Sequence, residues 1–196
     1  MSDLSHSTVC AAYRDGVSEV REAVTFLGEG AAQSPTPCPE WNVLELVTHL
    51  WCTADRYHRL LGYAVAGCPE RMLVNEELAV ENERAVAAAA ATDLNKVLSS
   101  FVSSAEAYLP RATVSWEVAP YQVGGGSVGD ALGVAAIEWH IHAWDLRKSV
   151  GHDYRPTCAE TLRWCWNRAV PHLPITTDGD AWAALLAAAG RRGRAE

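Results

Sequence analysis

The chain has 196 residues, which is enough for one domain with a hydrophobic core of its own. Its formal net charge is −8, which argues against a nucleic-acid-binding protein, because such a protein needs a basic face to meet phosphates. No apolar stretch is long enough to span a bilayer, and the N-terminal residues lack the pattern of a signal peptide, so we expect a cytoplasmic protein. In that compartment the six cysteines, none of them in a CxxC pair, are expected to be free thiols.

The N-terminal third of the chain predicts two helices separated by a rigid loop. Apolar residues recur at three- and four-residue steps over about residues 7–28, which is typical of an amphipathic helix. Three alternating prolines within residues 33–40 exclude a helix there. Asn42, with Glu45 after it, has the spacing of a capping box and predicts a second helix that extends to about Gly62.

The middle of the chain predicts one long helix and a short extended segment. The helix covers residues 76–109, with residues 92–93 as a point of interruption and Pro110 as its end. Its alanine-rich stretch, residues 85–91, is suited either to a homodimer interface or to the core. Residues 112–123 alternate β-branched and aromatic side chains, which predicts a short hairpin before a glycine-rich linker.

The last third predicts three more helices, at residues 128–151, 157–170 and 180–189, each bounded by a capping residue or by glycine. The predicted fold class is all-α, a bundle of four main helices with short extra helices and a small extended excursion before the fourth main helix. Because there is no internal repeat and no long linker, we expect residues 1–196 to form a single domain.

Side chains that bind metals lie on two of the predicted helices. Glu138 and His142 are four residues apart and therefore share one helical face, where an apolar helix leaves both polar groups in need of a partner. His49, on the inward face of the second helix, is the candidate to join them. Two histidines and a carboxylate with an open position are typical of a reactive zinc site and suit Fe²⁺ as well. Asp145 is spaced to accept the imidazole N–H of His142 on the side of the ring that faces away from the metal.

The same residues also have a plainer interpretation. In it both histidines are isolated and separately satisfied, the glutamate is an exposed helical residue, and Asp145 pairs with Arg147 or Lys148. Spacing alone does not choose between the two interpretations, because a glutamate and a histidine four residues apart are common on any helix.

Two other histidines and one cysteine are also potential metal ligands by residue type. His140 and His58 lie on other helical faces than the proposed ligands, which excludes them. Cys52 shares the face of His49, where it is either a fourth ligand or a buried apolar thiol. The sequence contains no HExxH, GxSxG or dinucleotide-binding fingerprint that would indicate another chemistry.

Several segments resemble one known family in the expected order. Residues 36–41, TPCPEW, with residues 43–50, VLELVTHL, resemble the opening of the mycothiol-dependent maleylpyruvate isomerase-like family, within the DinB-like superfamily. Residues 138–146, EWHIHAWDL, resemble that family's E-x-x-x-H-x-W-D-L helix. Residues 185–191, LLAAAGR, resemble its L-L-A-x-x-G-R ending.

The resemblance implies a DinB-like four-helix bundle that holds a divalent metal, usually zinc, with Fe²⁺ or Ni²⁺ as alternatives. It implies His49, Glu138 and His142 as the ligands and mycothiol as cosubstrate. Two departures stand out: Glu40 occupies a position where the family commonly has glycine, and the isomerase's C-terminal domain, with its substrate-binding arginine, has no match here. Arg191 and Arg192 are candidate anion contacts, but we interpret them as solvated tail charges.

The expected function is a metal-dependent transferase or isomerase that adds a low-molecular-weight thiol to an electrophilic small molecule. A metal-bound thiol loses its proton at neutral pH and becomes the nucleophile. Two alternatives stay open: a thiol-independent metal enzyme, such as a hydrolase or a tailoring enzyme of secondary metabolism, and a non-catalytic metal-containing protein that binds a small molecule.

Overall fold

A computed structural model of the chain describes residues 5–39, 41–67, 76–119, 126–176 and 178–191. Within these ranges the regular structure is helical, with no strand and one isolated bridge between Pro35 and Asn42. The elements in chain order are α1 (His6–Leu27), the 3₁₀ turn η1 (Glu29–Ala31), α2 (Val43–Val65), α3 (Glu76–Ala89), α4 (Leu94–Val114), α5 (Val128–Lys148), α6 (Ala159–Ala169) and α7 (Ala181–Ala188). The predicted all-α bundle is confirmed.

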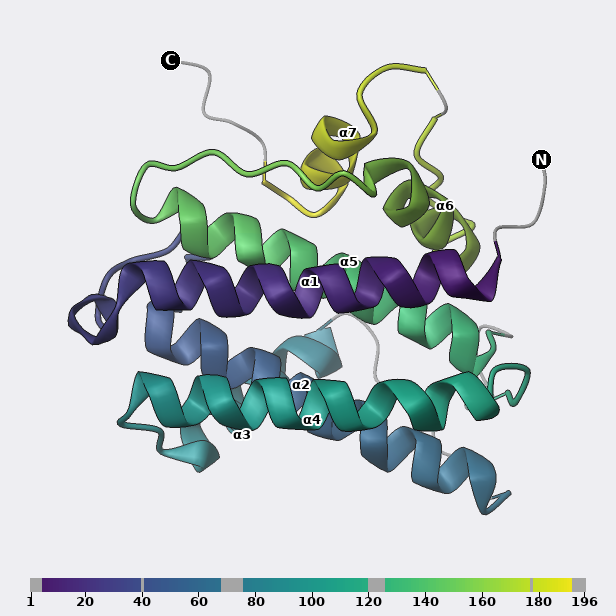
Figure 1. The fold of residues 1–196 in the computed structure, drawn as a ribbon, viewed down its shortest axis with the longest axis horizontal. Coiled ribbons are helices and arrows are strands. Elements are labelled where there is room, and N and C mark those ends of the chain that lie inside the picture. Colours follow the sequence, from purple (N-terminus) through teal and green to yellow (C-terminus); the bar gives the residue numbers. More distant parts are fainter. Residues whose placement is uncertain (1–4, 40, 68–75, 120–125, 177, 192–196) are drawn as a thin grey trace.

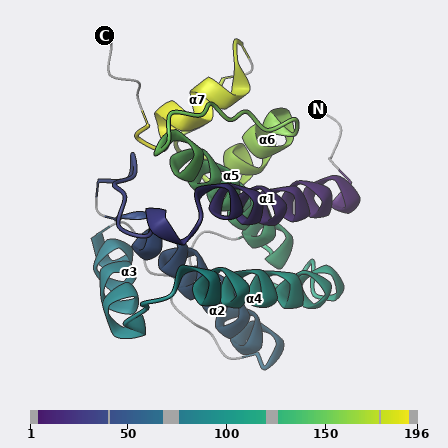
Figure 2. The same cartoon turned by 60° about the vertical axis from the view of Figure 1, so that its left-hand side comes forward.

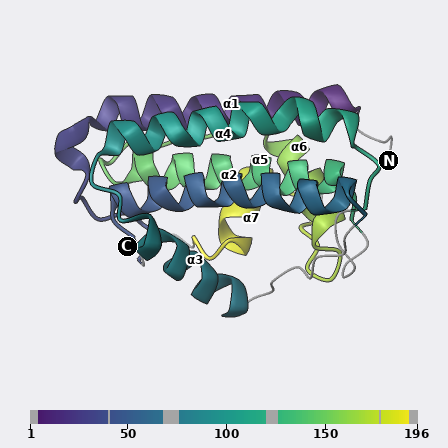
Figure 3. The same ribbon diagram turned by 90° about the horizontal axis from the view of Figure 1, so that it is seen from below.

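Four long helices form the bundle. α1 packs against α5, and α2 packs against α4, so that the two pairs enclose the core (Figures 1 and 3). α6 and α7 lie over the outer side of α5, while α3 lies outside α2 (Figure 2). None of these helices, within the part of the chain that the structure describes, combines the length and apolar character needed to cross a lipid bilayer.

Trp139 of α5 is fully buried and joins the four helices at the centre of the bundle. Its indole contacts Tyr13 of α1, Tyr57 of α2 and Phe101 of α4, each edge to face with ring centroids 5.0–6.3 Å apart. Such T-shaped contacts are the preferred geometry of aromatic pairs and add to the free energy gained from burial. The core is therefore anchored one residue away from Glu138, at the level of the predicted site.

The helix starts follow the capping residues that the sequence contains. The Asn42 side chain accepts from the backbone N–H of Glu45, whose carboxylate accepts from the N–H of Asn42. Ser127 and Asp130 form the same reciprocal arrangement at the start of α5. These interactions satisfy backbone donors that the first turn leaves unpaired, so they fix where both site-bearing helices begin.

The long third helix that the sequence predicts is two helices. The chain leaves α3 through Ala90, whose φ is +44°, and Asp93 then caps α4 by accepting from the N–H of Lys96. The prediction that Pro110 ends the helix is wrong, because α4 continues past Pro110 to Val114. A proline removes one backbone donor, and the carbonyl left without that donor belongs to the exposed residue Glu106, where water can reach it.

The predicted hairpin is wrong, and one of the two interpretations of the alanine-rich stretch is excluded. Residues 112–114 complete α4 and residues 115–117 form a turn, so the described part of the predicted hairpin contains no strand. The carbonyls of Trp116 and Val118 accept instead from the first backbone donors of α5. The alanine-rich residues of α3 are not core, because no residue of that helix is buried.

The crossing of α1 over α5 depends on Gly16. A Cβ atom there would lie 2.8 Å from the Cβ of Trp139 and 3.3 Å from the ring of His140. Helices approach this closely only where one side chain is absent, because interiors are already packed at the density of organic crystals.

We expect Gly16→Ala to lower the free energy of unfolding by about 1–3 kcal/mol, because the added methyl overpacks the crossing. Gly62→Ala is the matched control within α2, where a Cβ meets nothing within 4 Å. It should raise stability by roughly 0.5–1 kcal/mol, because alanine loses less backbone entropy on folding. Urea unfolding measures both, and equal stability of the two variants would contradict the tight crossing.

Candidate functional site

The structure brings the two predicted histidine ligands together. α2 and α5 run side by side in opposite directions (Figures 1 and 3), and the rings of His49 and His142 lie edge to face with centroids 5.3 Å apart. Both side chains are buried, and His49 is only 4% exposed. Two imidazoles bound to one tetrahedral zinc place their ring centroids about 5 Å apart, so this spacing suits a shared cation.

Glu138 lies one turn before His142 on α5, with its Oε2 atom buried and without a hydrogen-bond partner. The Nδ1 atom of His49 is also buried and unpartnered. Across the described ranges, no three His, Cys, Asp or Glu side chains stand close enough together to surround a metal ion. The three predicted ligands therefore do not surround a metal position as they stand, although Oε2 of Glu138 and Nδ1 of His49 are both without a partner.

Burial sets the protonation of two of these groups. It lowers the pKa of His49 well below its usual value, and electrostatic interactions with His142, Arg56 and Arg191 lower it further. Burial also raises the pKa of Glu138, and electrostatic interactions with His142 and Arg56 partly offset that rise. A neutral imidazole has a lone pair free for a cation, and a cation would stabilise the ionised carboxylate that burial disfavours.

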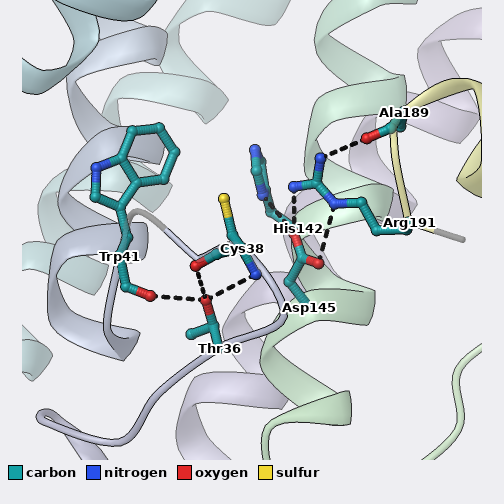
Figure 4. Close-up of polar contacts among 7 residues, drawn as sticks. All are labelled: Thr36, Cys38, Trp41, His142, Asp145, Ala189 and Arg191. Atoms are coloured by element: carbon teal, nitrogen blue, oxygen red, sulfur yellow. Dashed lines mark hydrogen bonds and ion pairs between the residues drawn. The ribbon is translucent and has the colours of Figure 1, made fainter. Parts of the chain in front are cut away.

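Trp41 covers His49 from the loop that precedes α2. The indole stacks on the imidazole with centroids 4.3 Å apart and planes 21° from parallel. The loop is held by Thr36, whose hydroxyl donates to the carbonyl of Trp41 at 2.7 Å and accepts from the N–H of Cys38 at 3.2 Å (Figure 4). The TPCPEW segment thus positions an aromatic cover over the site, although Glu40 itself lies outside the described residues.

Asp145 connects His142 to Arg191. Its Oδ2 atom lies 2.9 Å from Nδ1 of His142, and Arg191 donates to the same carboxylate from Nη2 at 2.8 Å and from Nε at 3.2 Å (Figure 4). Arg191 also donates to the carbonyl of Ala189 at 2.7 Å. The interpretation of Arg191 as a solvated tail charge is therefore wrong; Arg192 lies outside the described residues. The residue spacing gave no signal for this contact, because it joins helix α5 to the segment after α7.

The alternative partners of Asp145 are engaged elsewhere. Arg147 pairs with Glu19 of α1 at 2.7 Å, and Lys148 pairs with Asp153 at 2.8 Å. Burial by itself raises the pKa of Asp145, but hydrogen bonds and charge from His142 and Arg191 outweigh it and hold that pKa below its usual value. Asp145 is thus ionised, and it accepts the Nδ1–H of His142 so that the Nε2 lone pair is free.

The other histidines have separate structural partners. His140 is buried, lies 3.0 Å through Nε2 from the carbonyl of Ala12, and has the hydroxyl of Tyr154 2.5 Å from its Nδ1. His58 contacts the carbonyl of Ser104 at 2.8 Å and Arg111 at 2.6 Å. Both histidines therefore bond to residues other than the proposed ligands, in agreement with their exclusion on helical position.

A cavity of about 250 Å³ borders Glu138 and His142 on the side away from α2. It lies between α5, the end of α6 and the end of α7, and apolar side chains make up most of its wall. Its wall is formed by Val134, Ile137, Glu138, Ile141, His142, Trp166, Ala169, Val170, Ala189 and Arg191. The site therefore has a polar centre and an adjoining apolar pocket, the usual composition of a small-molecule site.

We expect Arg191→Gln to lower the free energy of unfolding by about 3 kcal/mol at neutral pH, because it leaves the buried Asp145 carboxylate with one partner fewer. The folded-state pKa of Asp145 lies below its unfolded value. Its ionic contribution is therefore present at neutral pH and lost as pH falls through the folded pKa. The difference between wild type and variant should shrink in acid, as measured by urea unfolding across pH.

The control is Arg155→Gln, which removes an exposed ion pair with Asp180 and should cost much less than Arg191→Gln at neutral pH, because solvent screens the pair. A cost for Arg191→Gln as small as that of the control would show that the Asp145 contact contributes little.

Comparison with known proteins gives one match. The family model described as the mycothiol maleylpyruvate isomerase N-terminal domain matches residues 13–147, which hold His49, Glu138, His142 and Asp145. A search of curated proteins and a search of solved structures found no match. Since the matched region covers most of the chain and both helices of the site, the chain belongs to the mycothiol maleylpyruvate isomerase N-terminal domain family.

Proposed function

We propose that this chain is a divalent-metal-dependent enzyme that joins a low-molecular-weight thiol, mycothiol in the first instance, to an electrophilic small molecule. His49, Glu138 and His142 would hold the metal, most simply Zn²⁺, and Asp145 would orient His142. The observation that carries the proposal is the pair of buried imidazoles beside an unpartnered buried carboxylate, at the edge of an apolar cavity. Membership of a mycothiol-related family supports the choice of thiol.

A divalent metal bound at this site would favour the ionised form of the thiol. Two residues of the chain would support the metal ligands. Asp145 fixes the imidazole of His142, and Trp41 covers His49 against water. With an epoxide as electrophile, the sulfur electron pair forms the new C–S bond and the C–O bond breaks. The released oxygen then takes up the proton that the thiol lost, so the addition consumes no other reactant.

The cavity between α5, α6 and α7 is the proposed place of the electrophile. Because it borders Glu138 and His142, a molecule held there would present its reactive carbon to a thiol at the metal centre. A volume of about 250 Å³ with apolar walls favours a compact, largely apolar molecule.

We expect His49→Ala and Glu138→Gln to lose bound metal and at least 100-fold of thiol-dependent turnover, because each removes one of three proposed ligands. Elemental analysis of the purified variants and an assay with mycothiol and chlorodinitrobenzene measure the two effects. His152→Ala, on an exposed loop residue, is the control and should keep both metal and turnover.

The same assay separates the rival functions. Full turnover in a folded His49→Ala variant would refute the proposal. Metal-dependent turnover of a substrate in thiol-free buffer would instead favour a hydrolase or tailoring enzyme, and stoichiometric binding without product would favour a binding protein.

Ala169→Trp should narrow the cavity without touching the proposed ligands. We expect kcat/KM for chlorodinitrobenzene to fall roughly tenfold or more, because the added indole excludes part of the electrophile. Metal content and thiol affinity should stay unchanged, and Ala183→Trp, on the exposed face of α7, should change none of the three. Unchanged kinetics in a stable Ala169→Trp variant would place the electrophile elsewhere.

A further inference from the structure

The hydroxyl of Thr53 on α2 is a buried polar group without a partner. The side chain is 4% exposed, and its Oγ1 atom has no hydrogen bond and no access to solvent. Buried hydroxyl groups are nearly always hydrogen-bonded, since burial removes the water that would otherwise serve them. An unpartnered buried hydroxyl beside a candidate site is therefore a reason to look for a ligand that satisfies it.

Thr53 lacks a hydrogen bond that four other helical hydroxyls of this chain make. Threonine and serine side chains in helices commonly donate to the carbonyl four residues earlier. Thr48 donates in this way to Leu44 at 2.7 Å, and Thr113 donates to Leu109 at 2.8 Å. Thr25 and Ser99 make the same bond. For Thr53 the equivalent acceptor is the carbonyl of His49, yet its hydroxyl makes no such bond.

The contacts of the neighbouring turns place Thr53 against α5. His49, four residues before it, contacts His142 of α5, and Tyr57, four residues after it, contacts Trp139 of α5. Residues at this spacing share one helical face, so Thr53 faces α5 between them. α2 and α5 run in opposite directions (Figure 3). The turn after His49 is therefore expected to face the turn before His142, which contains Glu138.

Three unpartnered polar atoms therefore gather on the facing turns of α2 and α5: Nδ1 of His49, Oγ1 of Thr53 and Oε2 of Glu138. The first and last belong to proposed metal ligands. A hydroxyl is a poor ligand for zinc compared with imidazole or carboxylate, but it donates a strong hydrogen bond to an anion. The arrangement thus offers a donor next to the position where an anionic ligand of the metal would sit.

We propose that the Thr53 hydroxyl donates a hydrogen bond to the sulfur of the small thiol bound between His49 and Glu138. The proposal rests on the proposed function, since it assigns Thr53 to the same thiol. A hydrogen bond to an ionised sulfur favours the thiolate over the thiol, so Thr53 would strengthen binding of the reactive form. Valine has the shape of threonine without the donor, which makes the role testable with little change in packing.

The test measures N-acetylcysteine binding to cobalt-loaded protein by the absorption that a thiolate bound to cobalt produces. For Thr53→Val we expect the dissociation constant to rise roughly tenfold or more, as for loss of a hydrogen bond to a charged group. Cobalt stoichiometry should remain unchanged. Thr53→Ser, which keeps the hydroxyl, should bind the thiol within about threefold of wild type.

Thr48→Val is the matched control in the same helix, because its hydroxyl is already satisfied by Leu44. It should leave thiol affinity unchanged and lower the stability of the metal-free protein. Thr53→Val should leave that stability equal or higher, because the hydroxyl it removes has no partner in the metal-free protein.

Two outcomes overturn the inference and are distinguishable. Equal thiol affinity of wild type and Thr53→Val, with thiol absorption present in both, would refute the role of Thr53 alone. Absence of thiol absorption in cobalt-loaded wild type would refute the proposed function, together with the ligand assigned to Thr53.

Discussion

The site depends on the packing of α2 against α5, which buries polar side chains inside an apolar bundle. Burial raises the free energy of each polar atom that lacks a partner, and three such atoms, on His49, Thr53 and Glu138, face the same small region. Close to these atoms, Trp139 of α5 packs against an aromatic ring from each of the other three helices. A ligand that satisfies these atoms would recover free energy that folding leaves unrealised.

The three proposed ligands differ in how firmly other residues hold their side chains. His142 is fixed, because Asp145 holds its Nδ1 and Arg191 holds Asp145 in turn. His49 is held by the stacked ring of Trp41 rather than by a hydrogen bond. Glu138 is the ligand held least, since the buried Oε2 atom of its carboxylate has no hydrogen-bond partner. An ion arriving here would meet one oriented imidazole, one shielded imidazole and one carboxylate free to complete the set.

The two sides of α5 have different chemistry, which fits the proposal that a thiol and an electrophile meet at this helix. The side toward α2 carries the polar atoms, and the side toward α6 and α7 borders an apolar cavity of about 250 Å³. Glu138 and His142 belong to both sides. The terminal elements therefore complete the site, since the segment after α7 supplies Arg191 and the end of α6 supplies part of the cavity wall.

The sequence alone determined the elements of this protein, because the signals for helices are local. The capping boxes at Asn42 and Ser127 set the starts of α2 and α5, and the four-residue spacing of Glu138 and His142 set their common face. Local signals failed at Pro110, where a helix tolerates an exposed proline, and at residues 112–117, where a strand-like pattern has no partner strand. Only the tertiary structure decided what lies beside what: Arg191 reaches Asp145 across 46 positions, and the hydroxyl of Thr53 is left unpaired between packed helices. Such contacts depend on how whole helices cross and on whether a side chain bonds to its own helix backbone. Residue spacing carries neither kind of information.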